Sequence, residues 1–126
     1  MLSGLFAKKE KKEINWIPLT AVSTLDEIDQ KSKTQPILIF KHSTRCSISS
    51  MTLNRFENAC EDSPSFDLYF LDLIANRAVS NEVAIHYGVE HQSPQAILVV
   101  DGKAVYDASH TAIDYHELTK RTKTHQ

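Results

Sequence analysis

The sequence is poor in glycine and has no long apolar run, and each shortage argues against a class of protein. Only three of the 126 residues are glycine, namely Gly4, Gly88 and Gly102, so a glycine-rich phosphate-binding loop is missing and nucleotide binding is not expected. No apolar stretch approaches the about 20 residues that a membrane-spanning helix needs. Residues 1–7 lack the leading positive region and the apolar segment of a secretory signal. We therefore expect a cytoplasmic protein with no membrane partner.

An excess of charge of one sign is also missing. The chain has 14 lysines and arginines against 16 aspartates and glutamates, which leaves a net charge of −2. Such a balance offers no general attraction to nucleic acid, so nucleic acid is not an expected partner. With 41% hydrophobic and 24% charged residues, the composition suits one globular domain. We assign residues 14–126 to a single domain and residues 1–13 to a charged N-terminal arm. A weak homodimer through this arm is an open alternative.

Apolar patterning predicts strands and helices in the order β-α-β-α-β-α-β-β-α, which is an α/β fold with a central mixed sheet flanked by helices. The run Pro36–Phe40 is apolar without alternation, as is typical of a central strand buried on both faces. Asp101-Gly102 predicts a hairpin between the last two strands. The predicted strands span about 16–19, 36–40, 66–71, 95–100 and 103–106, and the predicted helices span about 24–33, 44–60, 76–87 and 111–121.

Three helix features are expected from local sequence. Thr24 and Glu27 have capping-box spacing at the start of the first helix. Ser43 or Thr44 is expected to cap the second helix. The second helix also carries two apolar stripes, which predict packing on more than one neighbour. These stripes contain Ile48, Met51 and Ala59 on one side and Leu53, Phe56 and Cys60 on the other.

The most informative residue is Cys46, which follows a buried strand at the point where a helix begins. Unpaired N–H groups and the positive end of the macrodipole at a helix start favour the thiolate form. Ser49 stands where a Cys-x-x-Cys pair would have its second cysteine, so the predicted site is monothiol. The other cysteine, Cys60, lies on the same predicted helix, about 21 Å away at 1.5 Å per residue. That distance excludes a disulfide, and Cys60 is expected to be a small buried apolar residue.

Side chains around Cys46 are candidates for stabilising the thiolate or attracting substrate. Ser49 and Ser47 can donate hydroxyl hydrogens, Thr44 lies at the helix start, and Arg45 and Lys41 supply positive charge that would attract an anionic small thiol. Surface charges are as often simply solvated. A metal site is not expected, because the cysteine and histidine residues show no paired ligand spacing. His42 and His110 invite a Cys–His dyad, but the predicted geometry gives no reason for the ring of His42 to meet the sulfur.

The element order, a cysteine at this helix start and Ser93-Pro94 before the hairpin together resemble the thioredoxin fold. The resemblance implies a cis peptide bond at Pro94, facing Cys46. The stretches Ile39–Ser50, His91–Ile97 and Ala108–His110 resemble the monothiol bacilliredoxins, thioredoxin-fold proteins of the bacillithiol system. Members of that family often read Thr-Cys-Pro-Ile-Ser, so this chain departs from the pattern beside its cysteine, at Arg45 and Ser47.

The resemblance implies thiol–disulfide exchange in which Cys46 removes a low-molecular-weight thiol, bacillithiol, from S-thiolated client proteins. This small thiol would be a co-substrate, and no tightly bound cofactor is expected. The backbone of Ser93 before Pro94 would pair with the incoming chain by strand addition. One alternative is a non-catalytic thioredoxin-fold adaptor. The other is a monothiol glutaredoxin with an iron–sulfur cluster, although that family typically reads Cys-Gly-Phe-Ser where this chain has Cys-Ser-Ile-Ser.

Overall fold

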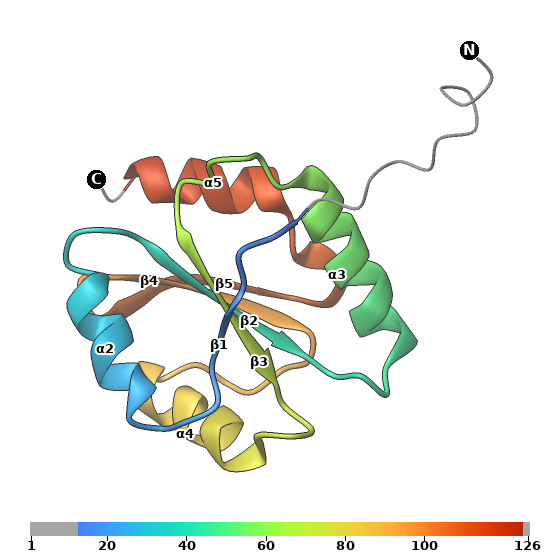
Figure 1. The fold of residues 1–126 in the computed structure, drawn as a ribbon, viewed down its shortest axis with the longest axis horizontal. Coiled ribbons are helices and arrows are strands. Elements are labelled where there is room, and N and C mark those ends of the chain that lie inside the picture. The colour runs from blue at the N-terminus through green and yellow to red at the C-terminus, as the bar shows by residue number, and fades with distance from the viewer. Residues whose placement is uncertain (1–12, 125–126) are drawn as a thin grey trace.

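A computed structural model describes residues 13–124 of the chain. All but the last residue of the N-terminal arm therefore lies outside the described residues, and so does the homodimer expected through it. The order of strands and helices is the predicted one (Figure 1). The strands are β1 (Ile17–Pro18), β2 (Ile37–His42), β3 (Asp67–Asp72), β4 (Gln95–Val100) and β5 (Lys103–Ser109), and the helices are α2 (Thr24–Lys31), α3 (Ser47–Ala59), α4 (Arg77–Tyr87), the 3-10 turn η1 (His110–Ala112) and α5 (Tyr115–Thr124).

The five strands form one mixed sheet in the order β1-β3-β2-β4-β5. The first three strands of that order run parallel, while β4 is antiparallel to β2 and β5 is antiparallel to β4. The predicted α/β fold with a central mixed sheet is confirmed, and β2 is the middle strand as its unbroken apolar run indicated. At the hairpin, Asp101 and Gly102 both have positive φ (52° and 74°), as a type I′ turn requires.

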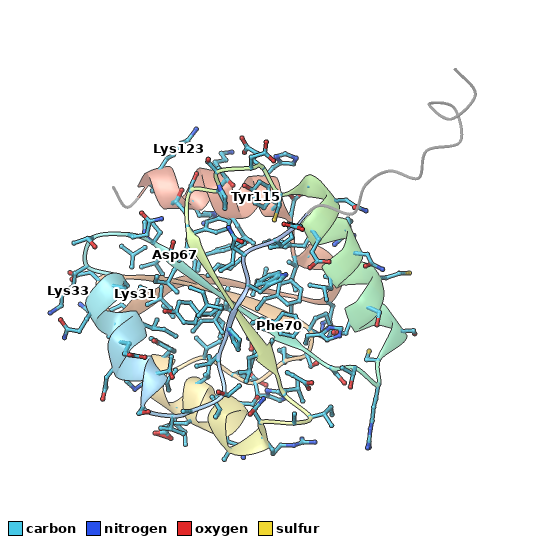
Figure 2. All side chains as sticks on the ribbon, viewed as in Figure 1. Lys31, Lys33, Asp67, Phe70, Tyr115 and Lys123 are labelled. Atoms are coloured by element: carbon cyan, nitrogen blue, oxygen red, sulfur yellow. The ribbon has the colours of Figure 1, made fainter. Side chains whose placement is uncertain are left out.

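Helices cover both faces of the sheet (Figure 1), and side chains fill the space between the helices and the sheet (Figure 2). Alternate side chains of a strand therefore enter different cores. Ile37 and Ile39 of β2 pack with α2 and α4, whereas Leu38 and Phe40 pack with α3 and α5. In the second core the rings of Phe40 and Phe56 lie 5.4 Å apart between their centroids. This aromatic contact fixes α3 against the strand that leads into it.

The junction between β2 and α3 differs from the prediction by several residues. Strand β2 continues through Lys41 and His42, because both residues find parallel backbone partners on β3. Helix α3 begins at Ser47, and its N-cap is Cys46 in an extended conformation (φ −114°, ψ 120°). The expected caps are therefore wrong: Ser43 belongs to the turn, where its carbonyl accepts a hydrogen bond from Cys46 N at 3.3 Å.

The predicted capping box of α2 is also wrong. The N-cap is Ser23, and it makes no side-chain capping bond. The N–H groups of Thr24, Leu25 and Asp26 donate instead to backbone carbonyls three residues earlier. These donors are satisfied by the backbone, so the side chains are not needed.

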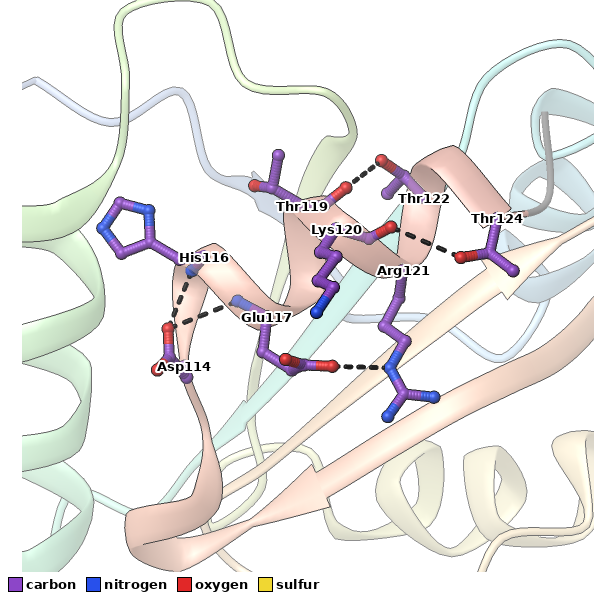
Figure 3. Close-up of polar contacts among 8 residues, drawn as sticks. All are labelled: Asp114, His116, Glu117, Thr119, Lys120, Arg121, Thr122 and Thr124. Carbon is purple, nitrogen blue, oxygen red and sulfur yellow. Dashed lines mark hydrogen bonds and ion pairs between the residues drawn. The ribbon is translucent and has the colours of Figure 1, made fainter.

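The last helix begins later than predicted. The segment expected as one helix from about 111 divides into η1 and α5, and Asp114 lies between them. One carboxylate oxygen of Asp114 accepts hydrogen bonds from the N–H groups of His116 at 2.8 Å and Glu117 at 3.3 Å (Figure 3). This side-chain cap starts the helix at Tyr115.

Only one of the two apolar stripes predicted for α3 is buried. Phe56 and Cys60 are 2% and 1% exposed, whereas Ile48 and Met51 are 45% and 65% exposed. The expectation that Ile48 and Met51 pack on a neighbouring element is wrong, because the described chain has no element over that side of α3. In residues 13–124, no helix has the length and apolar character needed to cross a membrane.

Candidate functional site

Cys46 lies at the end of the junction, where α3 begins, as predicted. Its carbonyl accepts the first helical hydrogen bond, from Ser50 N at 3.1 Å, and its side chain makes no capping bond. Cys46 is partly exposed and not bridged to Cys60, which lies at the other end of α3. A partly exposed cysteine at the positive end of a 13-residue helix is suited to nucleophilic exchange.

Ser49 occupies the position one turn beyond Cys46, and it is fully buried. Its hydroxyl oxygen accepts a hydrogen bond from Ser43 N at 3.1 Å and lies 2.8 Å from Nδ1 of His42. The expectation that Ser49 donates to the thiolate is therefore not met, because its hydroxyl is bonded to the turn and the sheet. The position that holds the resolving cysteine in a Cys-x-x-Cys pair is here a buried serine whose hydrogen bonds connect α3 to the turn and to β2.

His42 is the partner of Ser49 that sequence reasoning missed. It is 7% exposed, and its ring lies 5.5 Å from the ring of Phe70. Burial lowers the pKa of His42, against the opposing pull of Asp72 and Glu57, so the ring is neutral near pH 7. The available signal was the strand itself: β2 continues two residues beyond the predicted end, and alternation then carries His42 to the face that α3 covers.

Lys41 does not offer the surface charge that was expected of it. Its side chain is fully buried, and Nζ lies 2.9 Å from Nδ1 of His91. Burial lowers the pKa of Lys41 to about 8. The prediction that Lys41 binds substrate directly is therefore wrong. Alternation along β2 directs its side chain to the face covered by α2 and α4, away from α3.

Thr44, Arg45 and Ser47 flank the cysteine and are all exposed. The turn that carries them is held by Ser43, whose hydroxyl accepts a hydrogen bond from Arg45 N at 3.4 Å. Their predicted role in stabilising the thiolate stays a prediction. Arg45 is the charged side chain nearest to Cys46 in sequence, and it faces solvent.

The Ser93–Pro94 peptide bond is cis, and it lies just before β4 at the end of the sheet where β2 ends (Figure 1). The Pro94 carbonyl accepts a hydrogen bond from His110 N at 3.0 Å, and His110 has a left-handed backbone (φ 57°). The Ser93 hydroxyl is buried and has no hydrogen-bond partner among the described residues. These contacts tie the loop that contains Ser93 and Pro94 to the end of β5.

A pocket found in the structure lies away from Cys46, and the described residues offer no metal site. The pocket, of about 260 Å³, lies beside Cys60, at the opposite end of α3 from Cys46. Within residues 13–124 there is no cluster of three or more histidine, cysteine, aspartate or glutamate side chains that could hold a metal ion.

Comparisons with known proteins agree with the architecture. The family model described as "Monothiol bacilliredoxin BrxC" matches residues 17–118. A solved protein described as having a thioredoxin fold is 25% identical, with a TM-score of 0.74, and the match covers 85% of this chain and 93% of that one. Thioredoxin from Fasciola hepatica is 16% identical with a TM-score of 0.67 over 86% of this chain and 98% of its own. The reduced thioredoxin pre-protein of Schistosoma mansoni is 16% identical with a TM-score of 0.65, covering 88% and 98%.

Proposed function

Because the chain belongs to the monothiol bacilliredoxin family, we propose that Cys46 removes bacillithiol from mixed disulfides on client proteins. Family and fold together assign the chain to the thioredoxin-like oxidoreductases, whose chemistry is thiol–disulfide exchange. The small thiol and the client proteins are the specific parts of the proposal.

The proposed reaction has two exchange steps. In the first, the Cys46 thiolate attacks the small-thiol sulfur of the client disulfide; a bond forms between those two sulfurs, the client disulfide breaks, and the client sulfur leaves as a thiolate that takes up a proton. In the second, the thiolate of another small-thiol molecule attacks the same small-thiol sulfur and releases Cys46. The client cysteine is reduced, the incoming free small thiol is oxidised, and that thiol leaves joined to the one removed from the client as their disulfide.

The observation that carries the proposal is the contrast between Cys46 and Ser49. Cys46 is partly exposed at the helix start, while the position of a resolving cysteine holds a buried hydroxyl bonded to His42. A mixed disulfide on Cys46 therefore has no internal thiol to displace it, since Cys60 lies at the far end of α3. This arrangement requires an external thiol to complete the turnover.

We assign supporting roles to the exposed residues of the turn. Arg45 would attract an anionic small thiol, and Thr44 and Ser47 would hydrogen-bond to the reacting sulfurs. The client would pair with the backbone of Ser93 beside Pro94, as an extended chain added to the sheet end.

A release assay tests the proposed function. A client peptide carrying a bacillithiol mixed disulfide is incubated with the protein and free bacillithiol, and the peptide thiol is measured by mass. We expect catalytic release by the wild type and by Cys60→Ser, and only the uncatalysed rate with Cys46→Ser. A rate of release with Cys46→Ser that equals the wild-type rate would contradict the proposal.

A further inference from the structure

A buried lysine of β2 contacts the loop that precedes the cis proline. Lys41 is 0% exposed, and Nζ lies 2.9 Å from Nδ1 of His91, which stands three residues before Pro94. The side chain reaches the loop from the middle strand of the sheet. Its contact is with the loop and not with the reacting cysteine.

A second buried side chain ties the same loop. Gln95 is 0% exposed and lies opposite Lys41 in the ladder between β2 and β4. Its Oε1 accepts a hydrogen bond from Gln92 N at 3.3 Å, and its Nε2 donates to the carbonyl of Glu90 at 3.0 Å. Two neighbouring side chains of the sheet therefore determine where residues 90–94 lie.

The lysine contact depends on the protonation of His91. A lysine ammonium can only donate, so Nδ1 of His91 must accept, and the ring must be neutral with its hydrogen on Nε2. Protonation of His91 would remove the acceptor and place a second cation, on the exposed ring of His91, within hydrogen-bond distance of the buried ammonium of Lys41. Burial lowers the pKa of His91, and the nearby charges of Lys41 and of Arg77, at the start of α4, lower it further.

We propose that Lys41 and His91 form a pH-sensitive anchor that holds the client-binding backbone of Ser93 in place while His91 is neutral and releases it when His91 is protonated. Both are positioning residues, since neither touches the reacting sulfur. The inference rests on the proposed function only for the role of Ser93 in client binding; the anchor itself is a property of the loop.

The test compares two reactions of Cys46 between about pH 7.5 and about pH 5, a range that extends well below the ordinary histidine pKa of about 6.5, because the pKa of His91 is lowered from that value. One is exchange with a peptide mixed disulfide, which needs the Ser93 backbone. The other is alkylation by iodoacetamide, which does not. For the wild type we expect the ratio of exchange rate to alkylation rate to fall by about tenfold as the pH falls, the cost of losing one part-buried hydrogen bond.

Two variants of His91 separate the anchor from a general effect of pH. His91→Asn keeps an acceptor near the place of Nδ1 but cannot be protonated, so its ratio should stay level. His91→Leu removes the acceptor, so its ratio should be low at every pH. A wild-type ratio that does not change, or a His91→Asn ratio that falls like that of the wild type, would overturn the proposal.

Amide hydrogen exchange at Gln92, whose N–H donates to Gln95 Oε1, gives a readout independent of activity. After correction for the intrinsic effect of pH, this amide should lose protection at low pH in the wild type and keep it in His91→Asn. If amide protection is lost at low pH but the peptide mixed disulfide does not react with Cys46 at any pH, the proposed function is contradicted and the anchor stands. If the mixed disulfide reacts but amide protection is the same at both pH values, the anchor alone is contradicted.

Discussion

The hydroxyl of Ser49 lies 2.8 Å from Nδ1 of His42, so the residue one turn beyond the cysteine faces the sheet and not the thiol. In a dithiol site, both the first position and the position one turn later carry reactive thiols, whereas here only the first position does. The nucleophile remains at the surface, while the second position serves the packing of α3 on β2. The site is monothiol in geometry as well as in sequence.

Replacing Ser49 by alanine should weaken the fold without disabling the thiol. The change leaves Ser43 N and Nδ1 of His42 without their partner, and a buried group that loses its hydrogen bond costs about 1–3 kcal/mol. Urea unfolding measures this loss, and Ser50→Ala, at an exposed position next along the helix, is the matched control. Alkylation of Cys46 in the folded variant should keep its rate. A marked slowing would show that Ser49 acts on the thiolate after all.

Replacing Lys41 by methionine should stabilise the protein at neutral pH and weaken its exchange with clients. Burial lowers the pKa of Lys41 from 10.5 to about 8, so between these values the unfolded chain binds more protons than the folded one. The wild type should therefore gain stability as the pH rises from about 8 to about 10.5, by about 3 kcal/mol.

The difference in free energy of unfolding between the wild type and Lys41→Met isolates this gain from other titrations. Urea unfolding of both proteins at several pH values in that range supplies it. The advantage of the variant should shrink as the pH rises. An advantage that stays constant would mean that Lys41 is solvated in solution.

Replacing Arg45 by alanine should slow the reaction of Cys46 with an anionic small-thiol disulfide by several-fold and reduce its dependence on salt. Arg45 is exposed beside the cysteine, so its charge acts through solvent and is screened. The rate with a neutral reagent, 2-hydroxyethyl disulfide, should change little. Equal slowing with both disulfides would assign Arg45 a structural effect on the turn and no role in attraction.

Replacing Phe56 by alanine should cost about 3–5 kcal/mol, because it removes a buried ring and leaves a cavity. Phe56 is 2% exposed and packs against Phe40 and Tyr115 with ring centroids about 5.5 Å apart. Met51→Ala on the exposed side of α3 is the control and should change stability by less than about 0.5 kcal/mol. Equal effects of the two changes in thermal or urea unfolding would contradict the assigned orientation of the helix.

Periodicity and local signals predicted the order of elements, the middle strand and the hairpin, because apolar runs and turn residues act over a few residues. The same signals missed the end of β2, since Lys41 and His42 are polar and are held in the sheet by β3. Each side chain is buried with a partner on another element: Lys41 with His91, in the loop before β4, and His42 with Ser49, on α3. Pairings of this kind depend on how the chain folds back, and no local pattern announces them.

The start of α5 is a different case. Asp114 is a good capping residue, and its position before Tyr115 was a usable local signal. The predicted start at about residue 111 is too early, because residues 110–112 form the separate 3-10 turn η1. At α3, the extended backbone of Cys46 makes it the N-cap in place of the serine or threonine that is usual at this position.

The central claim is that the sulfur of Cys46 accepts bacillithiol and keeps it until an external thiol arrives. Intact mass measurement after incubation of the folded protein with bacillithiol disulfide, and separately with glutathione disulfide, tests it most directly. We predict a single bacillithiol adduct that maps to Cys46, disappears in Cys46→Ser, persists in Cys60→Ser and is lost on addition of free bacillithiol, with little adduct from glutathione disulfide. An unmodified protein under native conditions, or an adduct that maps to Cys60, would contradict the account.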